Sequence, residues 1–417
     1  MNPQLYYVDN ALYFEGIPLA DIAAHYGSPC FVYSRMTLKQ QWELFTDSLA
    51  DYPYQICYAV KANSNLAILQ TLAQLGSGFD IVSGGELQRV LTATGSAQGI
   101  VFSGAGKTAI EIEQALKAGI ACFNIESEAE LERIECIAQH HKLSAPIAIR
   151  VNPNIAVQTH PYIATGLHAN KFGVSIDQAY ALYRYAACSP ALQIKGIACH
   201  LGSQLLNTAP IVQALEQLLI MHDQLRCESI FLDHINLGGG LGVRYHQEKP
   251  PTRQEYITAL LEKLSGTGLR LIIEPGRSLV AHAGLLLTRV EYLKNREEKQ
   301  FVIVDAGMND FLRPALYQAW HDIKEVTIRS ELLQQNYDVV GPVCESSDVL
   351  GIDRSLRIQA GDLLAITSCG AYGFCMSSNY NTRPRAAEVM VDGDYAYLIR
   401  ARETIPELFA SESLLPH

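Results

Sequence analysis

Short apolar segments alternate along the first two thirds of the chain with stretches in which apolar residues recur at helical spacing. The apolar segments predict eight strands, at 54–60, 79–82, 100–102, 121–125, 147–151, 194–199, 234–237 and 271–274. The spacing between the first five predicts helices over 66–75, 86–94, 109–119 and 128–139. Ser127 followed by Glu130 is a capping-box pattern at the start of the last helix.

This alternation predicts parallel strands joined by helical crossovers. Eight such units within about 220 residues favour a (β/α)8 TIM-like barrel, although an open doubly wound sheet would give the same count. After residue 284 the pattern changes to strands separated by turn signals, at 285–292, 300–304, 337–343, 362–367, 386–391 and 395–399. We therefore predict an α/β protein with a barrel domain over 31–284. Residues 1–30 and 285–417 would form a second, mostly β domain that resembles a sandwich or barrel.

Composition narrows the range of partners. Charged residues make up 18% of the 417, below the ~25% of an average soluble domain, which fits a large interface. The net charge is −11 and Lys and Arg do not cluster, so we expect neither nucleic-acid nor membrane partners. Residues 1–16 lack a signal-peptide pattern, and no run approaches the ~18 apolar residues of a membrane span. With ten scattered cysteines and no CxxC pair, these features predict a cytoplasmic globular protein.

Candidate chemistry lies at the strand ends, where (β/α)8 barrels carry their active sites. Four strand ends deliver a lysine, a histidine, a glycine run and a Glu/Arg pair, and an aspartate lies in the second strand. These residues are Lys61, Asp80, His200 with Ser203, the run Gly238, Gly239 and Gly240, and the segment Glu274, Pro275, Gly276 and Arg277.

Each of these residues also has an ordinary structural interpretation. Lys61 could be a surface lysine whose stem packs on apolar residues, and the glycines could form a simple turn. His200 could be a packed rim residue, and Glu274 could pair with Arg277. Together, however, they match the needs of pyridoxal phosphate. A lysine partly removed from water would bond to the cofactor aldehyde, glycine N–H groups would hold the phosphate, and a carboxylate would face the pyridinium.

Several separated motifs, in order, closely resemble the fold type III pyridoxal-phosphate decarboxylases, which share the alanine-racemase fold. The motifs cover nearly the whole chain, at 58–63, 159–166, 170–173, 200–204, 238–240, 274–277, 305–310, 341–346 and 379–385. Within that family, the chain looks like the diaminopimelate decarboxylases. The resemblance implies pyridoxal 5'-phosphate as cofactor and an obligate homodimer with shared active sites.

The resemblance also implies roles for individual residues. In the barrel, Lys61 would bear the cofactor with Asp80 nearby, and His200 would stack on its ring. Ser203 and the glycine run would bind the phosphate, Glu274 would face the ring nitrogen, and Arg277 would also face the substrate.

In the second domain, the resemblance places Tyr372 at the phosphate and the substrate, and Arg313 and Tyr317 at the distal end of the substrate. Cys344, as proton donor, and Glu345 would be contributed across the dimer interface. Arg313 and Tyr317 are four residues apart and so share one helix face, where an arginine fork and a phenol can hold a carboxylate. Without the motif, Arg313 would be assigned to a helix end, and Cys344 to the buried thiols.

These assignments predict the substrate. Glu345 can take a distal ammonium, and Arg277, Arg313 and Tyr317 can take a distal carboxylate. That combination fits meso-2,6-diaminopimelate, converted to L-lysine and CO2 in the last step of lysine biosynthesis. The alternatives are a decarboxylase of another diamino acid or of carboxynorspermidine, an amino-acid racemase on the same fold, and a cofactor carrier. A racemase needs a second base opposite Lys61, usually a tyrosine, and carriers resemble the barrel alone.

Overall fold

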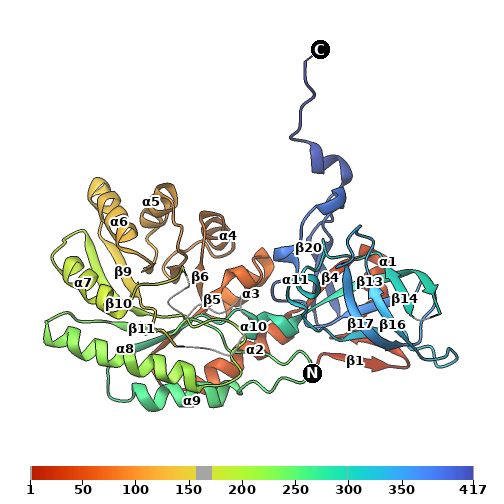
Figure 1. Ribbon diagram of the computed structural model, residues 1–417, viewed down its shortest axis with the longest axis horizontal. Coiled ribbons are helices and arrows are strands. Elements are labelled where there is room, and N and C mark those ends of the chain that lie inside the picture. Colours follow the sequence, from red (N-terminus) through yellow and green to blue (C-terminus); the bar gives the residue numbers. More distant parts are fainter. Residues whose placement is uncertain (1, 156–170, 298, 417) are drawn as a thin grey trace. The chain divides into compact units, whose positions relative to one another are not determined.

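The chain divides into two compact units. A computed structural model describes residues 2–155, 171–297 and 299–416 (Figure 1). The barrel unit comprises Gln41–Arg244 and Glu248–Leu279, and the β unit comprises Met1–Gln40, Tyr245–Gln247 and Val280–His417. The sequence placed these boundaries at 30 and 284. The first division lies later because the strand β4 (Cys30–Ser34) pairs with two strands of the β unit.

Eight parallel strands close into a barrel, which confirms the predicted architecture. Their order around the barrel is β10-β11-β12-β5-β6-β7-β8-β9. The strands are β5 (Tyr54–Ala59), β6 (Gly78–Ile81), β7 (Ile100–Phe102), β8 (Cys122–Ile125), β9 (Ala145–Arg150), β10 (Leu192–Ala198), β11 (His234–Asn236) and β12 (Arg270–Ile273). Each lies within two residues of its predicted bounds.

Helices surround this barrel, with α5 to α9 on its outside in Figure 1. They are α2 (Arg35–Leu49), α3 (Leu66–Gln74), α4 (Gly84–Thr94), α5 (Ala109–Ala118), α6 (Glu128–His141), α7 (Ile176–Ala187), α8 (Ala209–Cys227), α9 (Arg253–Leu264) and α10 (Arg277–Val280). Ser127 caps α6 as predicted, because its side chain accepts the Glu130 N–H. The reciprocal half of the predicted box is wrong, since the Glu130 carboxylate accepts the N–H of Glu126 instead. Of the described helices, none is long and apolar enough to cross a membrane.

The interior of the barrel places polar side chains at its C-terminal end. A buried layer of small and apolar residues is formed by Cys57, Val101, Cys122, Ala148, Ala198 and Ile272. Strand side chains alternate between the two faces of a sheet, so residues two positions later point inward as well. Asn124 thus follows Cys122, and Glu274 follows Ile272, directly above this layer.

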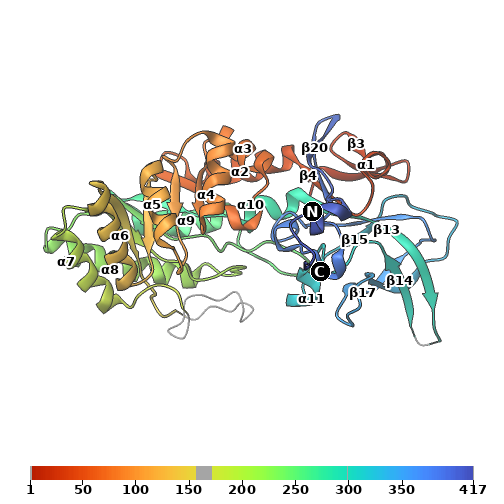
Figure 2. The ribbon, with the colours of Figure 1, turned by 90° about the horizontal axis from the view of Figure 1, so that it is seen from above.

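The β unit contains a nine-stranded sheet and a separate sheet formed by β1, β2 and β3. Its central strand β13 pairs with β4, β14 and β18, and β13 and β14 lie side by side in Figure 2. Its elements are β1 (Leu5–Val8), β2 (Ala11–Phe14), β3 (Ile17–Pro18), α1 (Leu19–Tyr26), β4, β13 (Gly284–Asn295), β14 (Gln300–Val304), α11 (Arg313–Tyr317), β15 (Ile323–Glu325), β16 (Gln335–Val340), β17 (Val349–Leu356), β18 (Leu363–Ile366), β19 (Ala387–Asp392) and β20 (Tyr395–Arg400). The mostly β prediction is confirmed, but it missed α1, β15 and β17.

Candidate active site

Lys61 and Asp80 form an ion pair at the C-terminal ends of the first two barrel strands. Lys61 lies in a 3-10 turn, Val60–Ala62, directly after β5. Its Nζ is 2.9 Å from Oδ2 of Asp80, which is fully buried at the end of β6. The other oxygen of Asp80 has no hydrogen-bond partner among the described residues. The sequence predicts an amine partly removed from water. The Lys61 side chain is 37% exposed and is positioned by the buried carboxylate of Asp80.

Glu274 is buried after β12 among side-chain amides. Asn236 Nδ2 donates to its Oε1 at 2.6 Å, and Asn124 Nδ2 lies 3.4 Å from the same oxygen. Burial, with the nearby negative charge of Asp80, raises the pKa of Glu274 to about 8. A pyridinium N–H would supply the positive partner that this carboxylate needs. Neither asparagine was predicted from the sequence. Each is a polar residue near the end of an apolar barrel strand, and that pattern could have identified it.

The three glycines form a cradle in which larger residues would not fit. Gly238 and Gly240 have φ of 64° and 112°, in the left-handed region that favours glycine. A Cβ on Gly239 would lie 2.1 Å from the carbonyl oxygen of Glu274, and one on Gly240 would lie 2.4 Å from that of Gly202. The strand ends therefore approach too closely for any side chain there.

Arg277 and Ser203 bring polar donors to the same end of the barrel. Arg277 Nη2 donates to Ser203 Oγ at 3.0 Å. A guanidinium, a hydroxyl and a glycine backbone form a donor set that suits a phosphate. Pro275 and Gly276 join the last strand to the first, since the Pro275 carbonyl accepts the Ala59 N–H at 3.1 Å.

His200 presents a neutral imidazole. Its Nδ1 accepts the N–H of Gly239 at 3.2 Å, so this nitrogen carries no proton. Burial, together with the positive charges of Arg150 and Lys61, holds the pKa of His200 well below its usual value. An uncharged flat ring beside the cradle can stack on another flat ring.

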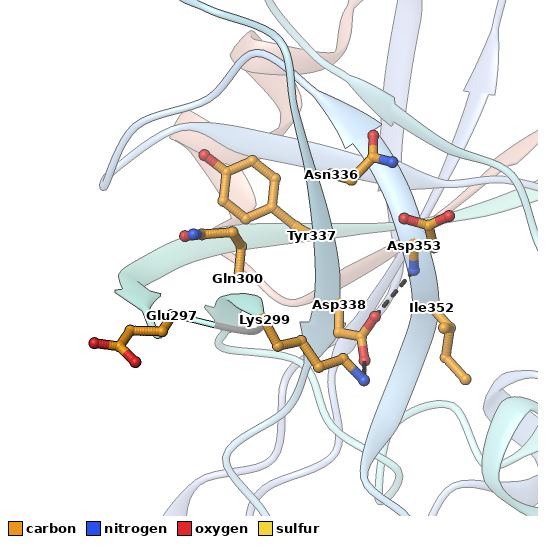
Figure 3. A pocket seen from close by; sticks show the side chains of 8 residues that line it. All are labelled: Glu297, Lys299, Gln300, Asn336, Tyr337, Asp338, Ile352 and Asp353. Carbon is orange, nitrogen blue, oxygen red and sulfur yellow. Dashed lines mark hydrogen bonds and ion pairs between the residues drawn. The ribbon is translucent and has the colours of Figure 1, made fainter.

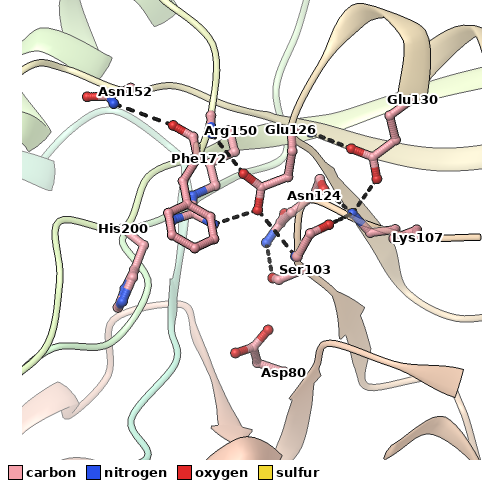
Figure 4. Close-up of polar contacts among 12 residues, drawn as sticks. Asp80, Ser103, Lys107, Asn124, Glu126, Glu130, Arg150, Asn152, Phe172 and His200 are labelled. Carbon is pink, nitrogen blue, oxygen red and sulfur yellow. Dashed lines mark hydrogen bonds and ion pairs between the residues drawn. The ribbon is translucent and has the colours of Figure 1, made fainter. Parts of the chain in front are cut away.

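A second polar cluster, also missed from the sequence, supports β7, β8 and β9 (Figure 4). Lys107 Nζ donates to the carbonyl oxygens of Gly104 and Asn124 at 2.9 and 2.8 Å and pairs with Glu130. Arg150 pairs with Glu126, which also accepts the N–H of Gly173.

Of the predicted motifs, 159–166 and Asn170 lie outside the described residues.

Lys107→Met should destabilise the protein strongly. The Lys107 side chain is 1% exposed and its partner Glu130 is 9% exposed, so the substitution leaves a buried carboxylate without its cation. Loss of one partner of such a pair costs about 3–5 kcal/mol. Urea unfolding of both proteins measures the change. A decrease below about 1 kcal/mol would contradict this account of the cluster.

The remaining predicted residues lie in the β unit. Arg313 and Tyr317 bound the short helix α11, and the Arg313 guanidinium carbon lies 5.8 Å from the centre of the Tyr317 ring. Tyr372 follows β18 in a left-handed conformation, with φ of 54°. Cys344 and Glu345 lie in the loop after β16.

The loop that carries Cys344 is held firmly but is open to solvent. Asp348 accepts the N–H groups of Val343 and Met308 at 2.7 and 2.6 Å. The Tyr380 hydroxyl donates to the Glu345 carboxylate at 2.6 Å. Cys344 itself is exposed. Burial, which would be expected of this cysteine without its motif, is therefore the wrong prediction.

A pocket of about 400 Å³ elsewhere in the β unit contains no predicted site residue (Figure 3). Its lining is mostly polar, and one ion pair lies within it. Lys299 pairs with Asp338, whose other oxygen accepts the Asp353 N–H at 3.0 Å.

Glu274→Gln should change how the stability of the cofactor-free protein depends on pH. A carboxyl whose pKa is raised by folding binds more protons in the native state than in the unfolded state. Its contribution is therefore fully present below pH 4.5 and is lost as the pH rises towards about 8. Glutamine does not titrate, so the variant should gain thermal stability relative to the parent as the pH rises, about 2–4 °C in Tm per kcal/mol. Parallel Tm curves against pH would contradict the assignment.

Comparison with known proteins identifies the family. A family model described as "Pyridoxal-dependent decarboxylase, pyridoxal binding domain" matches residues 35–281. The chain is 55% identical over 412 residues to diaminopimelate decarboxylase of Vibrio cholerae, covering 99% of both chains.

Two solved structures are similar over nearly the full chain. Diaminopimelate decarboxylase of Helicobacter pylori in complex with L-lysine has a TM-score of 0.91 and 44% identity, covering 94% of this chain and 99% of that one. The enzyme from M. jannaschii, also with L-lysine, has a TM-score of 0.95 and 36% identity, covering 100% and 99%. With the lysine, glycine cradle and buried glutamate at one end of a (β/α)8 barrel, these matches show that the chain belongs to the pyridoxal-dependent decarboxylases, with pyridoxal phosphate as its cofactor.

Proposed function

We propose that this protein is a carboxy-lyase that converts meso-2,6-diaminopimelate to L-lysine and CO2, the last step of lysine biosynthesis. The 55% identity over 99% of both chains to the Vibrio cholerae diaminopimelate decarboxylase carries this proposal. The complexes of two similar enzymes with L-lysine agree with it.

The barrel residues bind and orient the reacting groups. Pyridoxal phosphate, when bound here, would supply an electron sink for the loss of CO2. Lys61 holds the cofactor aldehyde, and Asp80 places its Nζ. Glu274 would hold the pyridine nitrogen, and the neutral ring of His200 would pack on the cofactor ring.

A different set of residues at the same end of the barrel would bind the phosphate. Ser203, the glycines Gly238 to Gly240, and the segment Pro275–Gly276 provide hydroxyl and backbone contacts there. Arg277, which donates to Ser203 Oγ, would contact both the phosphate and the substrate.

Residues of the β unit recognise the substrate and return the proton. Arg313 and Tyr317 bind the distal carboxylate, and Glu345 binds the distal ammonium. Tyr372 contacts the phosphate and the substrate. The Cys344 thiol gives its proton to the α-carbon after CO2 has left.

The active form is a homodimer in which Cys344 and Glu345 of one protomer serve the barrel of the other. This loop is held by Asp348 yet exposed in the single chain, as such a contribution requires.

Two inactive variants, Lys61→Ala and Cys344→Ala, should therefore complement each other. After subunits mix randomly, half the dimers carry one intact site, so about a quarter of parental activity returns. No recovery, despite exchange shown by native mass spectrometry, would place each site within one chain.

A substrate panel tests the proposed function. The purified protein with pyridoxal phosphate is given meso-diaminopimelate, carboxynorspermidine, ornithine or lysine separately, and the amine product is identified. We expect turnover of diaminopimelate alone, and turnover of another substrate in its place would overturn the assignment.

We further propose a cytoplasmic location, because all ten cysteines are free thiols, which fits a reducing compartment.

A further inference from the structure

The guanidinium of Arg313 is tied to a buried histidine that the mechanism above does not use. Arg313 Nε donates to Nε2 of His321 at 3.3 Å. Nδ1 of His321 lies 3.0 Å from the carbonyl oxygen of Thr367, just after β18. His321 is 0% exposed, and Arg313 is 5% exposed.

The two partners determine the protonation of this imidazole. An arginine N–H can only donate, so His321 Nε2 must be the acceptor. A carbonyl oxygen can only accept, so Nδ1 must carry the proton. His321 is thus a neutral ring that connects the arginine side chain to the backbone of the sheet, and each of its nitrogens has a defined role.

Aromatic packing fixes the orientation of the ring. The ring centre of Phe311 lies 4.7 Å from that of His321, and the ring centre of Tyr245 lies 5.0 Å from it, both edge-on. The Arg313 guanidinium carbon also lies 5.0 Å from the centre of the Tyr245 ring. Because the guanidinium is planar, fixing Nε and one face sets the direction of the whole group.

We propose that His321 is a positioning residue that orients Arg313 for the distal carboxylate of the substrate and thereby sets substrate specificity. The inference rests on the proposed function, since Arg313 is assigned there to that carboxylate. Arginine recognises a carboxylate through paired N–H groups, and displacement by about an ångström can cost 10²-fold. His321 itself makes no contact with the reacting atoms.

Two substitutions of His321 test its hydrogen bonds to Arg313 and to Thr367 separately. His321→Asn keeps a donor near the Nδ1 position for Thr367 but is too short to reach Arg313. His321→Gln extends its amide to the Nε2 position, where its oxygen can accept from Arg313. We expect the Asn variant of the holoenzyme to raise KM for diaminopimelate about 10-fold to 100-fold, with kcat within about threefold of the parent. The Gln variant should stay within about threefold in both constants.

A double-mutant cycle tests whether His321 acts through Arg313. With Arg313→Ala as background, His321→Asn should leave KM unchanged, because the guanidinium it orients is gone. An equal rise in KM in both backgrounds, or equal effects of Asn and Gln, would show a merely structural role and overturn the proposal. If the Asn variant does not fold, His321→Phe replaces it, since it keeps the ring packing without either nitrogen.

The activity of the parental enzyme distinguishes failure of the proposed function from failure of this inference. If it forms no lysine from diaminopimelate, the proposed function fails and this inference falls with it. If it does form lysine and the His321→Asn variant keeps the parental KM, only the inference is overturned.

Discussion

Lys61→Ala should abolish decarboxylation, lowering kcat/KM by more than about 10⁴-fold. The residue has two tasks that alanine cannot perform, the covalent bond to the cofactor aldehyde and the delivery of an amine to the substrate end of the barrel. Lys61 lies directly after β5, with its Nζ 2.9 Å from the buried Asp80 carboxylate. Lys107, in the loop after β7, pairs with Glu130 instead and is 1% exposed. Initial rates of CO2 release measure the loss.

Lys61→Arg is the matched control for this prediction. Arginine keeps the positive charge beside Asp80, but its guanidinium stays protonated and does not attack an aldehyde. If Lys61 served only to neutralise Asp80, this variant would retain activity. We expect it to be as inactive as Lys61→Ala, and borohydride reduction with peptide mapping should find the cofactor on Lys61 only in the parent. An active variant of either kind would exclude Lys61 as the cofactor lysine.

Cys344→Ala should lower kcat by about 10²- to 10⁴-fold, the usual contribution of a positioned proton donor. The thiol lies in an exposed loop whose backbone is fixed by Asp348, so removal of its sulfur should leave the fold intact. An unchanged Tm would show that stability is preserved. Rates of lysine formation at saturating diaminopimelate give the effect on kcat.

Two further variants define what the Cys344 result means. Cys344→Ser keeps the size of the side chain but has a much weaker acid, so it should resemble the alanine variant. Cys227→Ala removes another exposed cysteine, at the end of α8, and should leave the rate unchanged. A parental kcat in Cys344→Ala would exclude the thiol as donor.

The barrel could be predicted because its strands are short apolar runs separated by helical periodicity. That pattern places Lys61, Asp80 and Glu274 at strand ends, and the structure brings all three to the same end of the barrel. The supporting amides could not be predicted in the same way. Asn236 is recognisable only once parallel pairing sets it opposite Ile272, two residues before Glu274.

Other features depend on contacts between distant segments. Nothing near His321 in sequence points to the Thr367 carbonyl, which becomes its neighbour when β15 pairs with β18. The helix α1 was missed because it is only eight residues long and lies among strands. Pro18 precedes it and Gly27 follows with φ of 75°, so its boundary signals were present.

The most direct test of the central claim is the stoichiometry of the reaction in deuterated water. The enzyme is given meso-diaminopimelate labelled in both carboxyl groups, and released CO2, lysine and residual substrate are measured together. The account predicts one labelled CO2 for each L-lysine, one deuterium on the carbon that lost CO2, and no epimerised diaminopimelate. Deuterated epimers without CO2 would contradict it and identify the chain as a racemase.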